Sequence, residues 1–226
     1  MLRLHNLHKT FRLNGRSVTV AKSINQTLPS GVSIGLLGNN GAGKSTLLKM
    51  IAGTETPTSG RIISTGSISY PVGFAGSFHP DLTGAQNARF VARVYGVDTY
   101  ELEAFVEDFA ELGDHFRLPF RTYSSGMRSR LAFGVSMAIP FDTYLVDEVT
   151  SVGDAAFQAK SKAVFKERMQ KSGAIVVSHS MPMIKEMCEA GAVLQDGYFY
   201  FYAEIGKAIE HYSYTTKNQL PPWLRR

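Results

Sequence analysis

Cysteine is nearly absent from the sequence, which has one, Cys188, among 226 residues. A single thiol excludes an internal disulfide, so no covalent cross-link supports the fold, and a reducing compartment such as the cytosol suits the chain. Apolar residues surround Cys188 in the sequence, which favours a thiol packed in the core over a reactive one.

Long apolar runs are also missing. None approaches the ~20 residues that span a bilayer, and the first residues lack the pattern of a secretory signal. If the chain works at a membrane, we expect another chain to cross it. Dense runs of lysine and arginine are absent too, and the net charge is only +5 with a pI of about 9.3. This mild excess is compatible with an anionic membrane, with nucleic acid or with a nucleotide.

The composition is that of an ordinary globular protein, with 44% hydrophobic and 19% charged residues. A chain of this length buries a sizeable core, most simply as one domain over residues 1–226. Apolar periodicity and turn residues predict short strands within residues 1–37, with a turn at Asn14-Gly15. Beyond them, we expect helices at residues 44–52, 155–169 and 204–212, and strands at residues 143–146, 174–177 and 192–195. This alternation predicts an α/β fold with a parallel sheet, interrupted by a helical insert at about residues 84–139, whose first helix opens on a Thr83/Gln86 capping box.

The stretch GNNGAGKST fits the phosphate-loop pattern G-x-x-x-x-G-K-[ST]. An apolar run precedes it, as a buried strand would, and Leu47, Leu48 and Ile51 follow at helical spacing. Glycines let the loop backbone turn and aim N–H groups at phosphate oxygens, and the helix adds the positive end of its dipole. A chance glycine-rich turn is the competing interpretation. The expected phosphate-binding residues are Gly38, Asn39, Asn40, Gly41, Ala42, Gly43, Lys44, Ser45 and Thr46, with Lys44 on the β- and γ-phosphates and Ser45 on Mg²⁺.

The stretch TYLVDE, residues 143–148, reads as an apolar strand that ends in two carboxylates. In phosphate-loop nucleotidases the aspartate at such a strand end serves Mg²⁺, so we assign Asp147 to the metal. Glu148, one residue on, is placed to act as general base toward the attacking water. Many strands end in a carboxylate that caps a helix, so this pattern alone does not indicate a metal site. Together with the phosphate loop, it indicates a nucleotide-binding site.

The motif YSSGM, residues 123–127, begins 20 residues before the expected strand at Thr143 and resembles the signature LSGGQ of ABC-transporter ATPases. It departs from that signature in Tyr123, Ser125 and Met127, and keeps Ser124 and Gly126. The resemblance implies a RecA-like parallel sheet, an N-terminal antiparallel β subdomain and the helical insert. It also implies that Ser124, Ser125 and Gly126 contact ATP held by a second copy, that Asp154 closes a D-loop, that His179 is the switch histidine and that Phe11 stacks on adenine. A solvated or helix-capping His179 and a core Phe11 are the alternatives.

Most ABC ATPases place a glutamine between the phosphate loop and the helical insert, and here its position falls near Phe74 within YPVGFAGSFHPDLTG. With RTYSSGMRSRLAF and LVDEVTSVGDAAF, this loop resembles the ATPase subunit of bacterial capsular polysaccharide exporters. The similarity covers nearly the whole chain, and no residue is assigned to replace the glutamine.

The exporter resemblance implies ATP and Mg²⁺ as cofactors, a head-to-tail homodimer, and a peripheral position on the cytoplasmic face of the inner membrane. It implies an integral membrane permease dimer as partner, with periplasmic or outer-membrane export components beyond it, and no nucleic acid. An exporter of O-antigen, teichoic acid or another lipid-linked substrate, and a soluble ABC ATPase of DNA repair or translation, are the alternatives. We expect no C-terminal carbohydrate-binding domain.

Aromatic residues in the glycine-rich loop suggest where the permease docks. An exposed apolar loop is typical of a docking groove, although the two phenylalanines could instead pack inward. In the family this region receives a short helix of the membrane subunit, so the expected docking residues are Phe74, Phe78, Arg89, Phe90 and Arg93. The tail PPWLRR reads as frayed, with headgroup contact by Trp223 as the alternative.

Overall fold

The computed structural model describes residues 1–226 except residues 14, 74, 148–153, 218 and 225–226, with residue 13 described by its backbone alone. The chain forms two compact units. The first comprises Met1–Ser69, Phe141–Glu148 and Lys171–Arg226, and the second comprises Tyr70–Pro140 and Val149–Gln170.

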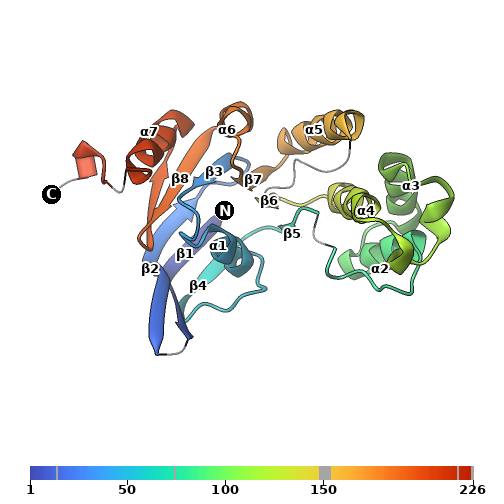
Figure 1. The fold of residues 1–226 in the computed structure, drawn as a ribbon, viewed down its shortest axis with the longest axis horizontal. Coiled ribbons are helices and arrows are strands. Elements are labelled where there is room, and N and C mark those ends of the chain that lie inside the picture. Colours follow the sequence, from blue (N-terminus) through green and yellow to red (C-terminus); the bar gives the residue numbers. More distant parts are fainter. Residues whose placement is uncertain (14, 74, 148–153, 218, 225–226) are drawn as a thin grey trace. The chain divides into compact units, whose positions relative to one another are not determined.

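Strands dominate the first unit (Figure 1). The strands are β1 (Leu2–Leu13), β2 (Arg16–Leu28), β3 (Ser33–Leu37), β4 (Ser59–Ser64), β5 (Ile68–Pro71), β6 (Thr143–Asp147), β7 (Gly173–Val177), β8 (Ala190–Gln195) and β9 (Tyr198–Tyr202). The boundary between the units falls within β5. Its helices are α1 (Lys44–Ile51), α6 (Met181–Met187), α7 (Ile205–Thr215) and a 3₁₀ turn, η4 (Pro222–Leu224). One sheet has the order β2-β1-β4, and the other has the order β5-β6-β7-β3-β8-β9.

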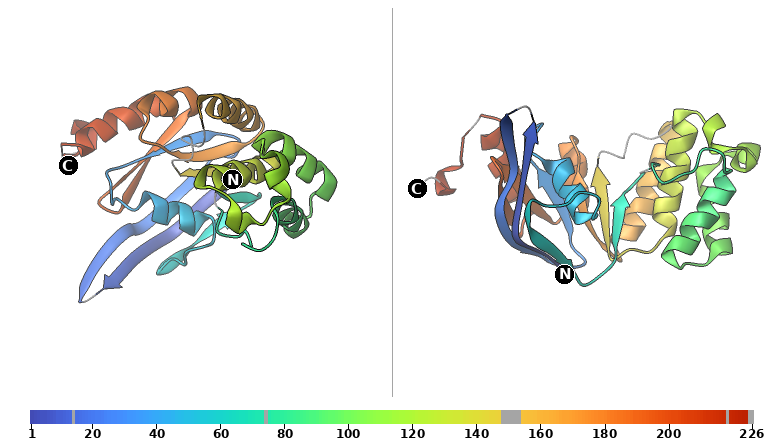
Figure 2. Two further views of the ribbon diagram at one scale, coloured as in Figure 1. Left: turned by 45° about the vertical axis from the view of Figure 1, so that its right-hand side comes forward. Right: turned by 90° about the horizontal axis from the view of Figure 1, so that it is seen from below.

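The hairpin of β1 and β2 is long, with 12 and 13 residues in its strands (Figure 2), so the expectation of short strands was wrong. The register shifts between Leu4 and Leu7 and again on either side of Lys9. Asn6 and Ser23 lie at φ of 47° and 52°, a region that side chains rarely adopt. Such bulges interrupt the period-two alternation of apolar residues, which made continuous strands look like several short ones.

The six-stranded sheet is parallel at its centre, as the alternation of strands and helices predicts. β3 pairs in parallel with β7 on one side and β8 on the other, and β6 pairs in parallel with β7. Every residue of β3 and of β7 is buried, because helices or the other sheet cover both faces. On one face, Ile184 of α6 and Ile205 of α7 close over Gly35 of β3.

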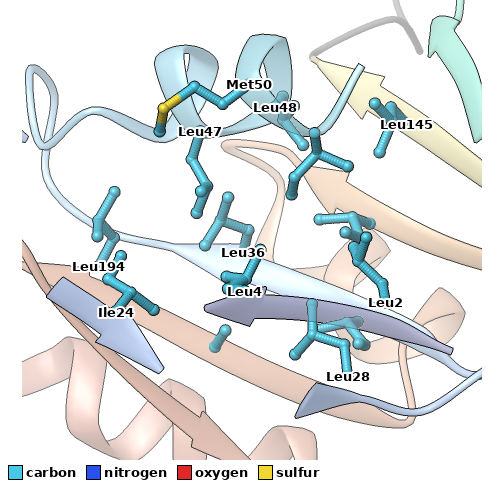
Figure 3. Packing of buried hydrophobic residues seen from close by; sticks show 14 of the residues in the cluster. Leu2, Leu4, Ile24, Leu28, Leu36, Leu47, Leu48, Met50, Leu145 and Leu194 are labelled. Atoms are coloured by element: carbon cyan, nitrogen blue, oxygen red, sulfur yellow. The ribbon is translucent and has the colours of Figure 1, made fainter. Parts of the chain in front are cut away.

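The main core lies on the other face of β3, under α1 and the antiparallel sheet (Figure 3). Leu47 and Leu48 of α1 project toward Leu36 of β3, and Leu4 of β1 approaches from the hairpin. The four buried residues of α1 are Leu47, Leu48, Met50 and Ile51, which recur at the i, i+3, i+4 spacing seen in the sequence. Burial of a leucine side chain contributes roughly 1.5–3 kcal/mol, so this stripe fixes α1 directly after the phosphate loop.

The second unit is helical. Its elements are α2 (Gly84–Tyr95), α3 (Thr99–Ala110), the 3₁₀ turns η1 (Gly113–Arg117) and η2 (Phe120–Thr122), α4 (Ser125–Ala138) and α5 (Ala155–Met169). The predicted capping box is confirmed: Thr83 Oγ1 accepts from the Gln86 N–H, and the Gln86 side chain accepts from the Thr83 N–H.

Phe109 of α3 is the centre of the aromatic core of this unit. Its ring lies 5.6 Å from Phe133 of α4 and 5.2 Å from Phe157 of α5, measured between centroids. Phe105 stacks on the same ring at 5.8 Å. These contacts join α3, α4 and α5 into one packed group.

Candidate nucleotide-binding site

The predicted phosphate loop, metal ligand and histidine all follow strands of the parallel sheet. The loop of residues 38–43 follows β3, Asp147 is the last residue of β6, and His179 lies two residues after β7. Because β3, β6 and β7 run in parallel, their carboxyl ends share one edge of the sheet. Ligands of open α/β sheets bind at that edge, so the topology gathers residues far apart in sequence into one site.

Two glycines of the loop are required by their surroundings. Gly38 has a φ of 155°, and a Cβ there would lie 2.5 Å from the carbonyl oxygen of Leu194. Gly43 has a φ of 102°, and a Cβ there would lie 2.7 Å from the Cβ of Val20. Side chains at either position would clash with β8 or β2 and strain the backbone, so the loop adopts this path only with glycine.

The loop ends at the start of a helix. Gly43 is the N-cap of α1, and no described side chain caps that helix. A helix N-terminus of this kind favours an anion. Lys44 bends back to donate to the carbonyl oxygens of Gly38 and Asn39 at 2.8 and 3.1 Å. Its ammonium is therefore held over the loop, and Ser45 is exposed beside it. The loop thus combines a helix terminus, a cation and a hydroxyl, which together suit a phosphate with a bound cation.

A cavity of about 280 Å³ adjoins the loop. It is lined by β2, the loop, the turn between β8 and β9 and the end of α7; the lining residues are Val18, Thr19, Val20, Asn39, Asn40, Gly41, Ala42, Leu194, Gln195, Asp196, Gly197 and Thr215. Its size approaches the lower end of small-ligand pockets.

Phe11 lies on the same hairpin as Val18, its partner across the two strands, and 41% of it is exposed. The alternative that it is a core aromatic is therefore wrong. The Lys9 ammonium lies 4.7 Å from the centre of the Phe11 ring and also donates to Glu55 and to the Thr56 carbonyl. Sequence reasoning missed Lys9, whose only signal was its position two residues before Phe11 on one face of a strand.

The signature segment begins α4. Ser124 is its N-cap, with Oγ accepting from the Met127 N–H at 3.3 Å, and Ser125 is the first helical residue. Among the described residues, a Cβ on Gly126 would find only Ser124 Oγ, at 4.0 Å, so none of them requires glycine there. A cavity of about 350 Å³ opens beside these residues; it is lined by Glu111, Leu112, His115, Ser124, Gly126, Met127 and Arg130.

Asp154, the described end of the predicted D-loop, is the N-cap of α5 and accepts from the Phe157 N–H at 2.9 Å. Arg130 of α4 donates to Asp154 at 2.7 Å and lies 4.5 Å over the Phe157 ring. The hydrogen bond from the Phe157 N–H is the main cause that lowers the pKa of the Asp154 carboxyl; burial opposes it, and Arg130 lowers the pKa further. Arg130 thus links the signature helix to the start of α5. The sequence offered no local sign of this pair, because 24 residues separate the partners.

Several predicted residues remain without a structural account. Glu148, the start of the predicted D-loop and Phe74 lie outside the described residues. Asp147 is partly exposed and His179 is exposed at the sheet edge. Within the described part of the chain, no three His, Cys, Asp or Glu side chains form a metal cage. A hydroxyl and a single carboxylate, Ser45 and Asp147, fit a Mg²⁺ that takes its other ligands from phosphate and water.

The expectation that Phe78 is exposed was wrong. Only 9% of it is exposed, and its ring packs edge-on against Phe120 at 5.3 Å, so it belongs to the core of the second unit. Arg89 forms an ion pair with Glu103 of α3, a residue that is 8% exposed. Phe90, by contrast, is 52% exposed, and Arg93 on the same helix is exposed too. The docking hypothesis therefore keeps α2 and loses Phe78.

A phosphate loop at the edge of a parallel sheet, an acidic strand end at the same edge and a helical unit with a signature segment define a nucleotide-binding cassette. The family model for ABC transporters matches residues 21–151, and the chain belongs to that family. It is 48% identical to the polysialic acid transport ATP-binding protein KpsT of Escherichia coli, over 94% of this chain and 96% of that protein. It is 43% identical to the capsule polysaccharide export ATP-binding protein CtrD of Neisseria meningitidis serogroup B, over 94% and 99%.

The fold agrees with this membership. A solved dimeric ATP-binding cassette in a post-hydrolysis state, bound to ADP and phosphate, superposes with a TM-score of 0.74 at 21% sequence identity. The match covers 88% of this chain and 96% of that one. Among the described residues, no helix is both long and apolar enough to span a membrane.

Proposed function

We propose that this chain is the ATP-binding and hydrolysing subunit of a bacterial exporter that moves capsular polysaccharide across the inner membrane. The observation that carries the substrate class is the near full-length similarity to two proteins named for polysialic acid transport and for capsule polysaccharide export. The arrangement of the phosphate loop supports the enzymatic part.

Each site residue has a defined task in this proposal. The loop N–H groups and Lys44 bind the β- and γ-phosphates, while Ser45 and Asp147 hold Mg²⁺, which neutralises phosphate charge. Glu148 takes a proton from the attacking water, and His179 contacts the γ-phosphate from the neighbouring strand. Phe11 stacks on the base, an interaction worth ~1–3 kcal/mol. Lys44 leaves its two loop carbonyls when a phosphate replaces them.

A second copy completes the site. Ser124, Ser125 and Gly126 of one subunit close on the ATP of the other, and Asp154 holds the adjoining turn in place. The open space around Gly126 supports this proposal, because a glycine that no described neighbour in its own chain requires is explained by an approach from outside. A two-fold arrangement makes both sites alike. ATP closes the dimer and hydrolysis reopens it.

The dimer acts on a permease in the inner membrane, so the chain itself is placed peripherally on the cytoplasmic face. We assign permease docking to α2, where Phe90 and Val94 are 52% and 64% exposed and lie one turn apart, with Arg89 and Arg93 beside them. Components of the periplasm and outer membrane receive the polysaccharide from the permease. In this proposal the chain is a single nucleotide-binding domain, and its helical insert, expected at about residues 84–139, is the part that docks on the permease.

The helical unit also bears on the class of ABC protein. α2 and α3 have 12 residues each and α4 has 14, so the described helices form no long coiled-coil arm of the kind that repair ATPases carry. This favours an exporter subunit over a soluble ATPase of DNA repair.

The test uses a capsulated bacterium that lacks its own exporter ATPase but retains its permease. Expression of the parent chain should restore surface polysaccharide, measured with capsule-specific antibody, and the permease should co-purify with it. Lys44→Ala should restore none while still co-purifying, since the loop belongs to the first unit and α2 to the second. Glu148→Gln should bind ATP and lose hydrolysis by ~10²–10⁴-fold.

Two results would contradict the proposal. Restoration of surface polysaccharide by Lys44→Ala would remove the phosphate-loop assignment. Recovery of O-antigen or teichoic acid export, without capsule export, in the corresponding deletion strains would move the chain to another lipid-linked substrate.

A further inference from the structure

We infer that the C-terminal helix α7 positions the phosphate loop for ATP, and that His211 is the residue that holds α7 in place to do so. The inference rests on the proposed binding of ATP at that loop. It concerns residues of the first unit only, and it gives a role to a buried histidine that the proposed chemistry leaves unused.

The start of the phosphate loop contacts two elements that come late in the chain. The side-chain amide of Asn39 donates to the backbone carbonyl of Thr215 at 3.1 Å. Thr215 is the last residue of α7 and is 2% exposed, and the final carbonyls of a helix have no partner inside it. Next to Asn39, Gly38 lies against the carbonyl of Leu194 in β8, close enough that a Cβ would stand 2.5 Å from it. The loop therefore leaves β3 between α7 and β8.

His211 joins these two elements. Its side chain is fully buried, with Nε2 3.1 Å from Oε1 of Gln195 and Nδ1 2.8 Å from the hydroxyl oxygen of Tyr202. Because an amide oxygen only accepts, Nε2 carries the proton, and Nδ1 accepts from the Tyr202 hydroxyl. Both ring nitrogens are thus satisfied in the neutral form, and burial lowers the pKa of the imidazole.

The contacts of His211 reach the loop by a short path. Gln195 directly follows Leu194, the residue that meets Gly38, so His211 fixes α7 to the same end of β8 that borders the loop. The rings of Tyr200 and Tyr202 pack edge-on against the imidazole, with centroids 4.9 and 5.7 Å away. One buried side chain therefore sets the distance between the two elements that flank the start of the loop.

The expected consequence is that α7 orders the phosphate loop before ATP arrives. A loop already in its bound shape loses less conformational freedom on binding, so its affinity is higher. Thermodynamic linkage makes the effect reciprocal: if α7 strengthens ATP binding, bound ATP must stabilise α7 to the same extent. This reciprocity separates positioning from a purely structural role.

The first experiment measures Mg·ATP affinity by titration calorimetry, well below the melting temperature of each variant. His211→Phe keeps an aromatic ring and removes both hydrogen bonds, and Asn39→Ala removes the amide that contacts α7. Loss of one such hydrogen bond should raise the Kd by about 2- to 10-fold. Ser213→Ala is the matched control on α7, since its exposed hydroxyl donates to the Glu210 carbonyl within the helix, and its Kd should equal that of the parent.

The second experiment follows amide hydrogen exchange with and without saturating Mg·ATP. In the parent, ATP should slow exchange in the second half of α7, residues 211–215. In Asn39→Ala, saturating ATP should still protect the phosphate loop, but the slowing in α7 should vanish. If His211→Phe fails to fold, hydrogen exchange in Asn39→Ala still tests whether α7 positions the phosphate loop.

A different set of results would show that α7 does not position the phosphate loop. If His211→Phe lowers the melting temperature but leaves the Kd within about two-fold of the parent, and ATP leaves exchange in α7 unchanged, α7 only stabilises the fold. If the parent chain itself does not bind Mg·ATP, the proposed function fails, and this inference fails with it.

Discussion

Replacing Gly126 by alanine should stabilise the isolated chain while disabling it. Gly126 lies in the first turn of α4, and its φ is not among the positive values of the chain. Among the described residues, an added methyl group would meet nothing nearer than Ser124 Oγ at 4.0 Å. Alanine is better than glycine in a helix by about 0.5–1 kcal/mol, chiefly because the unfolded chain loses freedom. For a chain of this size that gain raises the melting temperature by about 1–4 °C.

The functional effect should have the opposite sign. In the proposed dimer, Gly126 lies against the γ-phosphate held by the other subunit, and a methyl group would keep that phosphate from the N–H groups at the start of α4. Loss of one hydrogen bond to a charged group costs ~1.5–3 kcal/mol, which is about 10- to 100-fold in closure and turnover. Light scattering of the ATP-bound Glu148→Gln dimer, with and without Gly126→Ala, measures closure directly.

A second glycine provides the control. A Cβ on Gly84, at the start of α2, would lie 2.4 Å from the Tyr123 hydroxyl and 3.0 Å from Phe116. Gly84→Ala should therefore destabilise by about 1–3 kcal/mol, through overpacking. If Gly126→Ala melts below the parent, the space seen around it is wrong. If it melts higher and still hydrolyses ATP at the parental rate, the partner-subunit role of Gly126 is refuted.

Three further predictions concern stability and reactivity. Burial raises the pKa of Cys188 to about 12, so iodoacetamide at neutral pH should label it only after unfolding, and labelling of the native chain would contradict its buried position. The pKa of Asp154 is lower in the folded chain than its ordinary value of 3.8. Its charged form therefore stabilises the fold at pH values above 3.8, and this stabilisation is lost as the pH falls below 3.8. The melting temperature of Asp154→Asn should accordingly fall less than that of the parent between about pH 5 and pH 3, and equal slopes would show that the charge of Asp154 does not stabilise the fold. Phe109→Ala should cost ~3–5 kcal/mol in denaturant unfolding because its ring contacts α4 and α5 at once, whereas a cost below about 1 kcal/mol would contradict that packing.

The parts of the fold that the sequence predicted are those with local signals. The capping box at Thr83 located the start of α2, and a stripe of leucines after the phosphate loop located α1. The prediction of α5 at residues 155–169 agrees with Ala155–Met169, because Asp154 caps the helix within the same short segment. Each of these signals lies within one or two turns of the element it defines.

What the sequence could not predict depends on partners that are distant along the chain. Phe78 looked like an exposed loop residue because Phe120, which covers it, comes 42 residues later. Arg130 and Asp154 form their pair across 24 residues, and neither position suggests the other. The bulged strand β1 failed for another reason, since its irregularities removed the alternation by which strands are recognised. Periodicity reports which side of an element is buried, but not which residue buries it.

A single amide in the second unit has a consequence for how a partner meets the region before α2. Asn87 is 1% exposed; its Oδ1 accepts from the His79 N–H at 2.8 Å, and its Nδ2 donates to the carbonyls of His79, Leu82 and Thr83 at 3.1 to 3.2 Å. The turn at residues 79–83 is thereby fastened to α2 by one side chain. A protein that binds there contacts a turn whose conformational entropy was already lost on folding, so binding does not have to order it. A displacement of the turn would therefore also displace α2.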